Sequence, residues 1–257
     1  MNTTFDIKNY ILEETLKSIE NMPQDVYALY FFINTNEGFN AIPTLALMYN
    51  TLSELNESHI TPTEECWNIA FWMIDEIPLI GNNVEDTPIA QKSTKMLSEW
   101  FSDNGYNVST KELDPLDNCI EYTTGYRVIS EIIEEIAPKV KAFFKQKFNN
   151  DVVLLFGEYS FMPSDIKKIT SINGTDANIF LEYYENSINE TEKIIEEFKN
   201  SSVDCENEDY ENLFNEIEKA IKELEDNSAD NNDEDYEKFF AEFLKKVEAD
   251  FNFEEEK

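Results

Sequence analysis

The chain has 257 residues, enough for one substantial domain with an extension or for two small domains. Its hydrophobic content of 41%, with 13% aromatic residues, excludes a disordered acidic protein, because such a chain buries enough apolar surface to offset the entropy lost on folding. The formal net charge of -34, from 54 acidic and 20 basic residues, argues against direct contact with nucleic acid or anionic membranes and favours basic proteins or cations.

The first predicted element is an amphipathic helix over residues 3–21 that begins behind a threonine cap. Residues 25–33 are β-branched, aromatic and apolar almost throughout, which predicts a central strand buried on both faces. After the turn-forming residues 34–40, residues 44–49 are expected to return as a second strand. These three elements begin a sheet that a helix covers.

Residues 60–80 fit two periodicities, and the sequence leaves helix and strand both open there, with a weak preference for helix. A helix follows over residues 88–102, with Asp86 or Thr87 as its cap and Gly105 just beyond its end. A long amphipathic helix is predicted over residues 126–148, bent or divided at Pro138. Residues 151–159 then form a second strongly buried strand.

This order predicts an α+β fold, with a small mixed or antiparallel sheet packed by helices and an acidic C-terminal helical hairpin behind it. The domain occupies residues 1–185 and the acidic helical extension residues 186–257. Negative charge is concentrated late in the chain, because residues 182–257 hold 27 acidic and 8 basic residues, a net charge of 8 - 27 = -19.

The extension contains an internal repeat, in which EDYENLFNEIEKAIKE from Glu208 matches EDYEKFFAEFLKKVEA from Glu234. Each copy predicts an amphipathic helix, and the linker over residues 226–233 joins the two into a hairpin. Both apolar stripes are expected to dock on the body of the protein. The alternative is that one stripe binds a partner.

Candidate sites for metals and catalysis are few. His59, Glu64, Glu65 and Cys66 lie close in sequence, but their spacing matches no standard zinc site. Residues 226–237 place oxygen donors as in a helix-loop-helix calcium loop, yet Asn231 replaces the turn glycine and Asp233 the usual apolar residue. An acidic, solvated loop is the plainer interpretation. We assign no catalytic residue, metal ligand or cofactor from the sequence.

The helix that leads into DVYALYFFI, the Trp67 and Trp72 region, and DVVLLFGEYS followed by SDIKKITSIN form one pattern. In order and spacing it resembles a bacterial family, domain of unknown function 4303, over residues 1–185. The resemblance implies a pattern of strands and helices like that of accessory or immunity-type proteins. It carries no catalytic residues to this chain.

The leading hypothesis is a non-catalytic bacterial binding protein, such as an immunity-type antitoxin, whose acidic surface captures a basic toxin or nuclease. A DNA-mimic inhibitor of a DNA-binding enzyme and an enzyme with a non-standard Asp/Glu site are the alternatives. We expect a cytoplasmic protein, since the sequence shows no secretory signal and no apolar run of bilayer length. The candidate partner-binding residues all lie in the repeat: Tyr210, Glu211, Glu234, Asp235, Tyr236 and Phe239.

Overall fold

The computed structural model describes residues 6–35, 42–55, 59–72, 76–81, 87–118 and 120–201. The chain divides into two units, residues 1–191 and 192–257, and the fold that follows is that of the first. It is α+β, with a mixed sheet packed by helices, as the sequence predicts. The predicted hairpin and all six candidate partner-binding residues lie outside the described residues.

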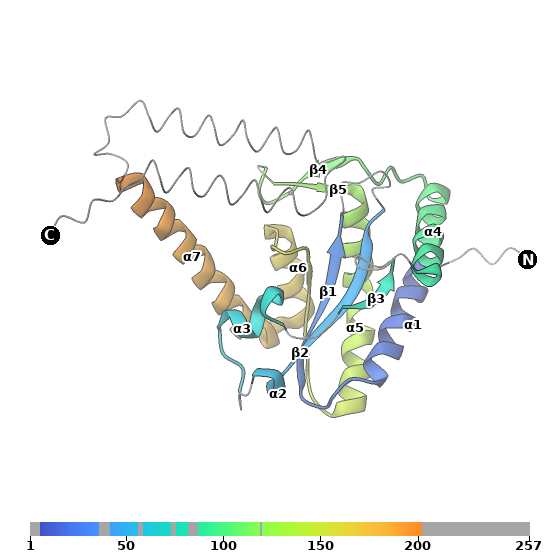
Figure 1. The fold of residues 1–257 in the computed structure, drawn as a ribbon, viewed down its shortest axis with the longest axis horizontal. Helices are drawn as coiled ribbons and strands as arrows, with labels where there is room; N and C mark the ends of the chain where they lie inside the picture. The colour runs from blue at the N-terminus through green and yellow to red at the C-terminus, as the bar shows by residue number, and fades with distance from the viewer. Residues whose placement is uncertain are drawn as a thin grey trace, which may run out of the picture. The chain divides into compact units, whose positions relative to one another are not determined.

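Four strands form the main sheet in the order β3-β2-β1-β6 (Figure 1). Their bounds are Val26–Asn34 for β1, Thr44–Thr51 for β2, Ile77–Ile80 for β3 and Val153–Gly157 for β6. β2 is antiparallel to both β1 and β3, whereas β6 is parallel to β1. The carboxyl ends of β1 and β6 therefore meet at one edge of the sheet.

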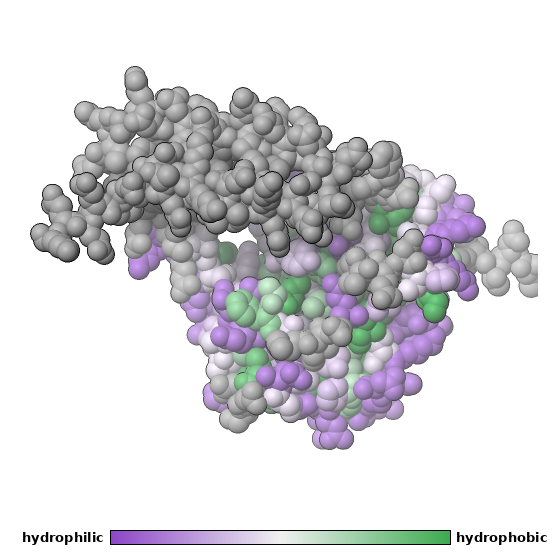
Figure 2. Space-filling model, in the orientation of Figure 1, coloured by the Kyte–Doolittle hydropathy of each residue, from purple (hydrophilic) through white to green (hydrophobic). Residues whose placement is uncertain are grey.

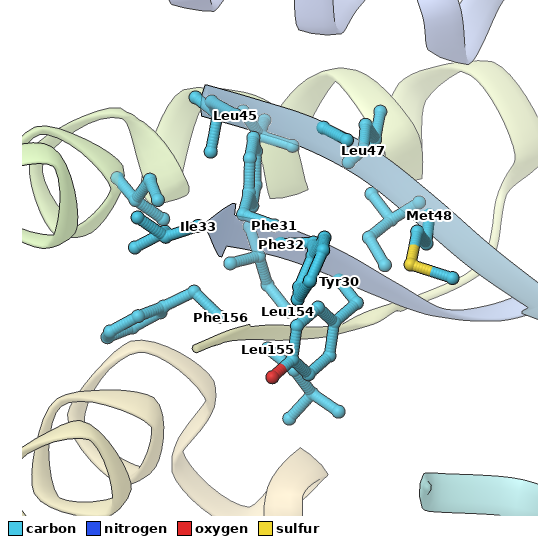
Figure 3. Packing of buried hydrophobic residues seen from close by; sticks show 14 of the residues in the cluster. Tyr30, Phe31, Phe32, Ile33, Leu45, Leu47, Met48, Leu154, Leu155 and Phe156 are labelled. Atoms are coloured by element: carbon cyan, nitrogen blue, oxygen red, sulfur yellow. The ribbon is translucent and has the colours of Figure 1, made fainter. Parts of the chain in front are cut away.

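The strands predicted at residues 25–33, 44–49 and 151–159 are confirmed. All of β6, and β1 as far as Ile33, are buried, as expected for strands covered on both faces. Figure 3 shows their side chains in the core, with the Tyr30 ring beside Leu155 of β6. This packing fixes the positions from which both strands leave the sheet.

Helices α1 (Ile7–Glu20), α4 (Pro88–Asp103) and α5 (Thr124–Phe148) lie together on one side of the sheet (Figure 1). The cap of α1 is Asp6, whose carboxylate accepts from the backbone N–H groups of Lys8 and Asn9, so the predicted threonine cap is wrong. Thr87 caps α4, and Gly105 follows it with a φ of +74°, as predicted. α5 is undivided and contains Pro138.

The region at residues 60–80, left open by the sequence, contains both kinds of structure. Short helices α3 (Glu64–Trp67) and η1 (Ile69–Phe71) come first, and β3 follows them. The two short helices lie against the second face of the sheet, where Trp67 contacts the Tyr27 ring. Strand β1 has a bulge between Val26 and Ala28. The bulge brings Tyr27 to this face, where its hydroxyl donates to the Cys66 carbonyl at 2.8 Å.

Helix α6 (Pro163–Asn173) protects the outer edge of the sheet. The Asn173 side chain accepts from the Leu154 N–H and donates to the Leu154 carbonyl, which satisfies backbone groups that an edge strand leaves open. The 3-10 helix η2 (Gly174–Ala177) and α7 (Asn178–Ser201) continue the chain. The extension predicted to be helical from residue 186 is therefore helical as far as Ser201.

Four elements were not predicted from the sequence: helix α6, described above, two short strands and one short helix. Strands β4 (Lys111–Leu113) and β5 (Glu121–Thr123) form a small antiparallel ribbon directly ahead of α5, and α2 (Leu52–Leu55) follows β2. Three residues are too few for an alternating pattern to register. No helix among the described residues has the length and apolar character that crossing a membrane requires.

Candidate functional site

A cleft of about 400 Å³ opens at the carboxyl ends of β1 and β6, and we call it the carboxyl-edge cleft. Thr35 enters it directly after β1, and Glu158, Ser160 and Met162 enter it from the segment that follows β6. Carboxyl ends of neighbouring parallel strands are where open sheets most often bind ligands, because the connections diverge there. The fold itself thus points to this edge.

The β4–β5 ribbon and the first turn of α5 form the other wall of the cleft. Lys111, Glu121 and Tyr122 line it from the ribbon, and Tyr126 lines it from α5. Lys111 lies 3.9 Å from Glu121, so the cation of this wall is close to a carboxylate of the same wall. Two carboxylates and two tyrosine rings are the main chemical features of the cleft.

Glu158 is held in place by neutral groups. The Thr35 hydroxyl and backbone N–H both donate to its Oε1. The Tyr30 hydroxyl donates to the Glu158 carbonyl at 2.5 Å. Gly157 permits this approach, because a Cβ there would lie 2.7 Å from the Tyr30 hydroxyl oxygen. The glycine is needed to bring the two strands' carboxyl ends this close.

Asp165 lies behind the cleft wall and is only 1% exposed. The Tyr126 hydroxyl donates to its Oδ2 at 2.6 Å, and the Met162 N–H donates to the same atom at 3.2 Å. Its Oδ1 is buried without a hydrogen-bond partner. Burial raises the pKa of Asp165 to about 6, although the Tyr126 and Met162 hydrogen bonds and the charge of Lys168 act to lower it.

The Asp165 carboxylate also affects the tyrosines around it. The pKa of Tyr30 and that of Tyr126 are both well above the ordinary tyrosine value, first through burial and then through the nearby charge of Asp165. Both hydroxyls therefore stay protonated and act as hydrogen-bond donors. Such a buried cluster, with one oxygen left unsatisfied, is costly to keep and is a mark of a functional site.

A second carboxylate, Asp114, has the opposite surroundings. It is fully buried, and its oxygens accept from the N–H groups of Leu116, Asp117 and Ser164. Burial acts to raise the pKa of Asp114, but these hydrogen bonds outweigh it and hold the pKa below the usual value. Asp114 thereby joins the ribbon to the first turn of α6, which makes its role structural.

The local cluster considered around Cys66 does not gather as a site. Cys66 is buried with its Sγ 3.5 Å from the Thr61 hydroxyl, whereas the neighbouring Glu64 and Glu65 are exposed. Throughout the part of the chain that the structure describes, no three His, Cys, Asp or Glu side chains are grouped so as to hold a metal ion. The carboxyl-edge cleft is thus the stronger candidate.

No family model, curated protein or solved structure matches this chain. The resemblance of residues 1–185 to domain of unknown function 4303 stays a prediction, and the chemistry of the site has to be argued from its own residues.

Reasoning from the sequence missed the residues of the cleft. One signal was present: Glu158 and Ser160 directly follow a buried strand, where polar side chains gather at a carboxyl edge. A second was Pro163 with Asp165 two residues later, a helix start that brings a carboxylate to the same edge. Tyr30 and Tyr126 gave no signal, because both are read as core residues of a strand and a helix.

Proposed function

We propose that this protein is a non-catalytic bacterial binding protein, of the immunity-type antitoxin kind, that captures a basic protein partner through its acidic surface. In this proposal the carboxyl-edge cleft receives a lysine or arginine side chain of the partner. The observation that carries it is Glu158, a carboxylate held by neutral donors in a cleft with two tyrosine rings.

The net negative charge of the whole domain also supports binding of a basic partner. Residues 1–181 contain 27 acidic and 12 basic residues, a net charge of 12 - 27 = -15. Several of those bases are already paired with carboxylates, among them Lys8, Arg127 and Lys141. A cation that approaches the cleft therefore meets an attractive field, which raises its association rate and selects against anionic partners.

The test uses the full chain and a short acetylated peptide with arginine at alternate positions, titrated by fluorescence anisotropy. Glu158→Gln is expected to weaken binding by about three- to tenfold, since one carboxylate near a cation contributes on the order of 1 kcal/mol at a partly exposed site. Binding should also weaken as salt rises from about 50 to about 500 mM.

The matched control is Glu20→Gln, which removes the same charge from the last residue of α1, next to the amino end of β1 and therefore at the opposite edge of the sheet. It should leave the affinity within about twofold, because screening limits the reach of an exposed charge to roughly one Debye length. Equal effects of the two substitutions would mean that net charge alone binds the peptide, and the cleft would lose its assigned role.

An enzyme with an acidic site is the second candidate, and Asp165 favours it. A carboxyl with a pKa of about 6 beside a cleft is suited to general acid–base work near neutral pH. The assay is a screen of chromogenic ester, phosphate and glycoside substrates at several pH values. Turnover that Asp165→Asn abolishes would support the enzyme, and its absence in the wild-type protein would leave the binding function as the proposal.

A further inference from the structure

The segment after β6 separates two pockets. Glu158, Ser160 and Met162 line the carboxyl-edge cleft, whereas Tyr159 and Phe161 line a second pocket of about 300 Å³, and Ser160 borders both. The segment bends over residues 158–160, and its side chains are divided between the two pockets. We call this second space the aromatic pocket and residues 158–162 the ridge.

Tyr30 of β1 lines the aromatic pocket together with aromatic side chains from three other parts of the fold. Trp67 comes from α3, Phe161 from the ridge, and Tyr183 and Tyr184 from the first turns of α7. The ring planes of Phe161 and Tyr184 are at 88° with their centroids 6.2 Å apart, so they form a corner that presents ring surface in two directions. Tyr159 is 75% exposed at the rim. Figure 2 shows patches of hydrophobic surface on the face of the molecule where α3 lies.

The electrostatics of the aromatic pocket favour a cation. None of the described side chains that line it is positively charged. Glu64 lies close enough to Tyr183 that its charge, after burial, raises the pKa of that hydroxyl. Ring faces carry negative potential, and a cation held over them is stabilised most where water is partly excluded. A neutral apolar side chain would gain from burial alone.

We propose that the aromatic pocket receives a second lysine or arginine side chain from the same basic segment, which crosses the ridge with one cation in each pocket. The inference rests on the proposed function for the acidic cleft and names the chemistry of the partner, an extended segment with closely spaced cations. The two pockets share Ser160. The ridge between them is held by the hydrogen bond that the Tyr30 hydroxyl donates to the Glu158 carbonyl. One rigid ridge thus sets the spacing that the partner has to match.

The experiment compares two substitutions of one ring in the full chain, with the alternating arginine peptide as probe. Tyr184→Leu removes the ring but keeps an apolar side chain, and Tyr184→Phe keeps the ring and removes only the hydroxyl. We expect Tyr184→Leu to weaken binding about fivefold and Tyr184→Phe to stay within about twofold of the wild-type protein, since the ring face binds the cation. Equal affinities for all three proteins would overturn the inference.

A matched peptide pair separates charge from apolar contact. Citrulline has nearly the shape of arginine without its charge, and norleucine is apolar. A peptide with one central arginine replaced by citrulline or norleucine should bind the wild-type protein about fivefold more weakly, and Tyr184→Leu should reduce that difference. Tighter binding of the norleucine peptide would overturn the inference in favour of an apolar side chain in the pocket.

The outcomes for the two pockets are distinguishable. If Glu158→Gln weakens binding and Tyr184→Leu does not, the proposed function stands and this inference fails. If neither substitution matters, both fail. Should Tyr184→Leu unfold the protein, Tyr159→Leu replaces it, because a side chain that is 75% exposed can be changed without disturbing the core. A loss of about threefold with Tyr159→Leu then supports the inference, and no loss overturns it.

Discussion

The packed middle of strand β1 and the surroundings of its carboxyl end differ in chemistry. In its middle, Phe31 and its neighbours are packed among apolar side chains, and residues 28–32 pair with β2 on one side and with β6 on the other. At its carboxyl end the same strand meets Glu158, Tyr126 and the buried Asp165, one of whose oxygens has no partner. The first region is built for stability. The second gives up stability to keep charge near an open cleft, and that difference is the main reason for placing function there.

The largest effect is expected in the packed region. Phe31→Ala should lower the free energy of unfolding by about 3–5 kcal/mol, because it removes a fully buried ring and leaves a cavity. Urea unfolding followed by circular dichroism measures the loss. Tyr159→Ala is the matched control at the carboxyl edge and should change stability by no more than about 0.5 kcal/mol. A loss below about 1 kcal/mol for Phe31→Ala would remove the contrast.

The second prediction concerns the pH dependence that Asp165 imposes. Its folded pKa of about 6 lies above that of an unfolded aspartate, so the folded state holds a proton that the unfolded state has lost. Its contribution to stability is complete below about pH 4 and is lost as pH rises through about 6. As pH rises from 4 to 7.5, the free energy of unfolding of Asp165→Asn should therefore increase relative to that of the wild-type protein by up to about 3 kcal/mol.

Unfolding of both proteins in urea across that pH range gives the difference directly, and pH effects from other groups cancel in it. A difference between variant and wild type that does not change with pH would show that Asp165 titrates normally. Burial of the Asp165 carboxylate would then not destabilise its charged form.

The third prediction has the opposite sign and belongs to Asp114. Because hydrogen bonds hold its folded pKa below the usual value, its contribution is present at neutral pH and is lost as pH falls through the folded pKa. Asp114→Asn should cost about 1–3 kcal/mol at pH 7, since it weakens hydrogen bonds from three N–H groups to a buried side chain. The cost should shrink at about pH 3. A variant as stable as the wild-type protein at pH 7 would contradict the structural role of Asp114.

The smallest effect is expected for Tyr126→Phe. The substitution keeps the ring in the cleft wall and removes only the hydroxyl that donates to Asp165 at 2.6 Å. We expect a loss of about 1 kcal/mol at pH 7 and a further rise in the pKa of Asp165, seen as a shift of its stability transition to higher pH. An unchanged transition would show that the hydroxyl does not hold the carboxylate.

The sequence predicted the packed region well and the carboxyl edge poorly, for a physical reason. Long runs such as residues 25–33 and 126–148 report their environment at every position, so the strand β1 and the helix α5 are confirmed. The cleft depends on single residues that follow different elements, and only the parallel pairing of β1 with β6 brings Thr35 and Glu158 together. Pairing between strands so far apart in the chain leaves no local pattern.

The acidic repeat is the opposite case, a strong sequence pattern without a described structure. Its pattern is strong, yet Tyr210, Tyr236 and the acids beside them lie outside the described residues, so their predicted role in partner binding is untouched by the structure. The sequence drew attention to the charge, and the fold drew attention to the cleft.

Hydrogen exchange of the full chain, with and without the arginine peptide, tests the central claim most directly. The account predicts slower exchange in the ribbon residues 120–123 and in the ridge residues 158–162, because a bound segment covers both walls of the cleft. Slower exchange confined to residues 202–257, with the ridge unchanged, would contradict it and assign partner binding to the acidic repeat.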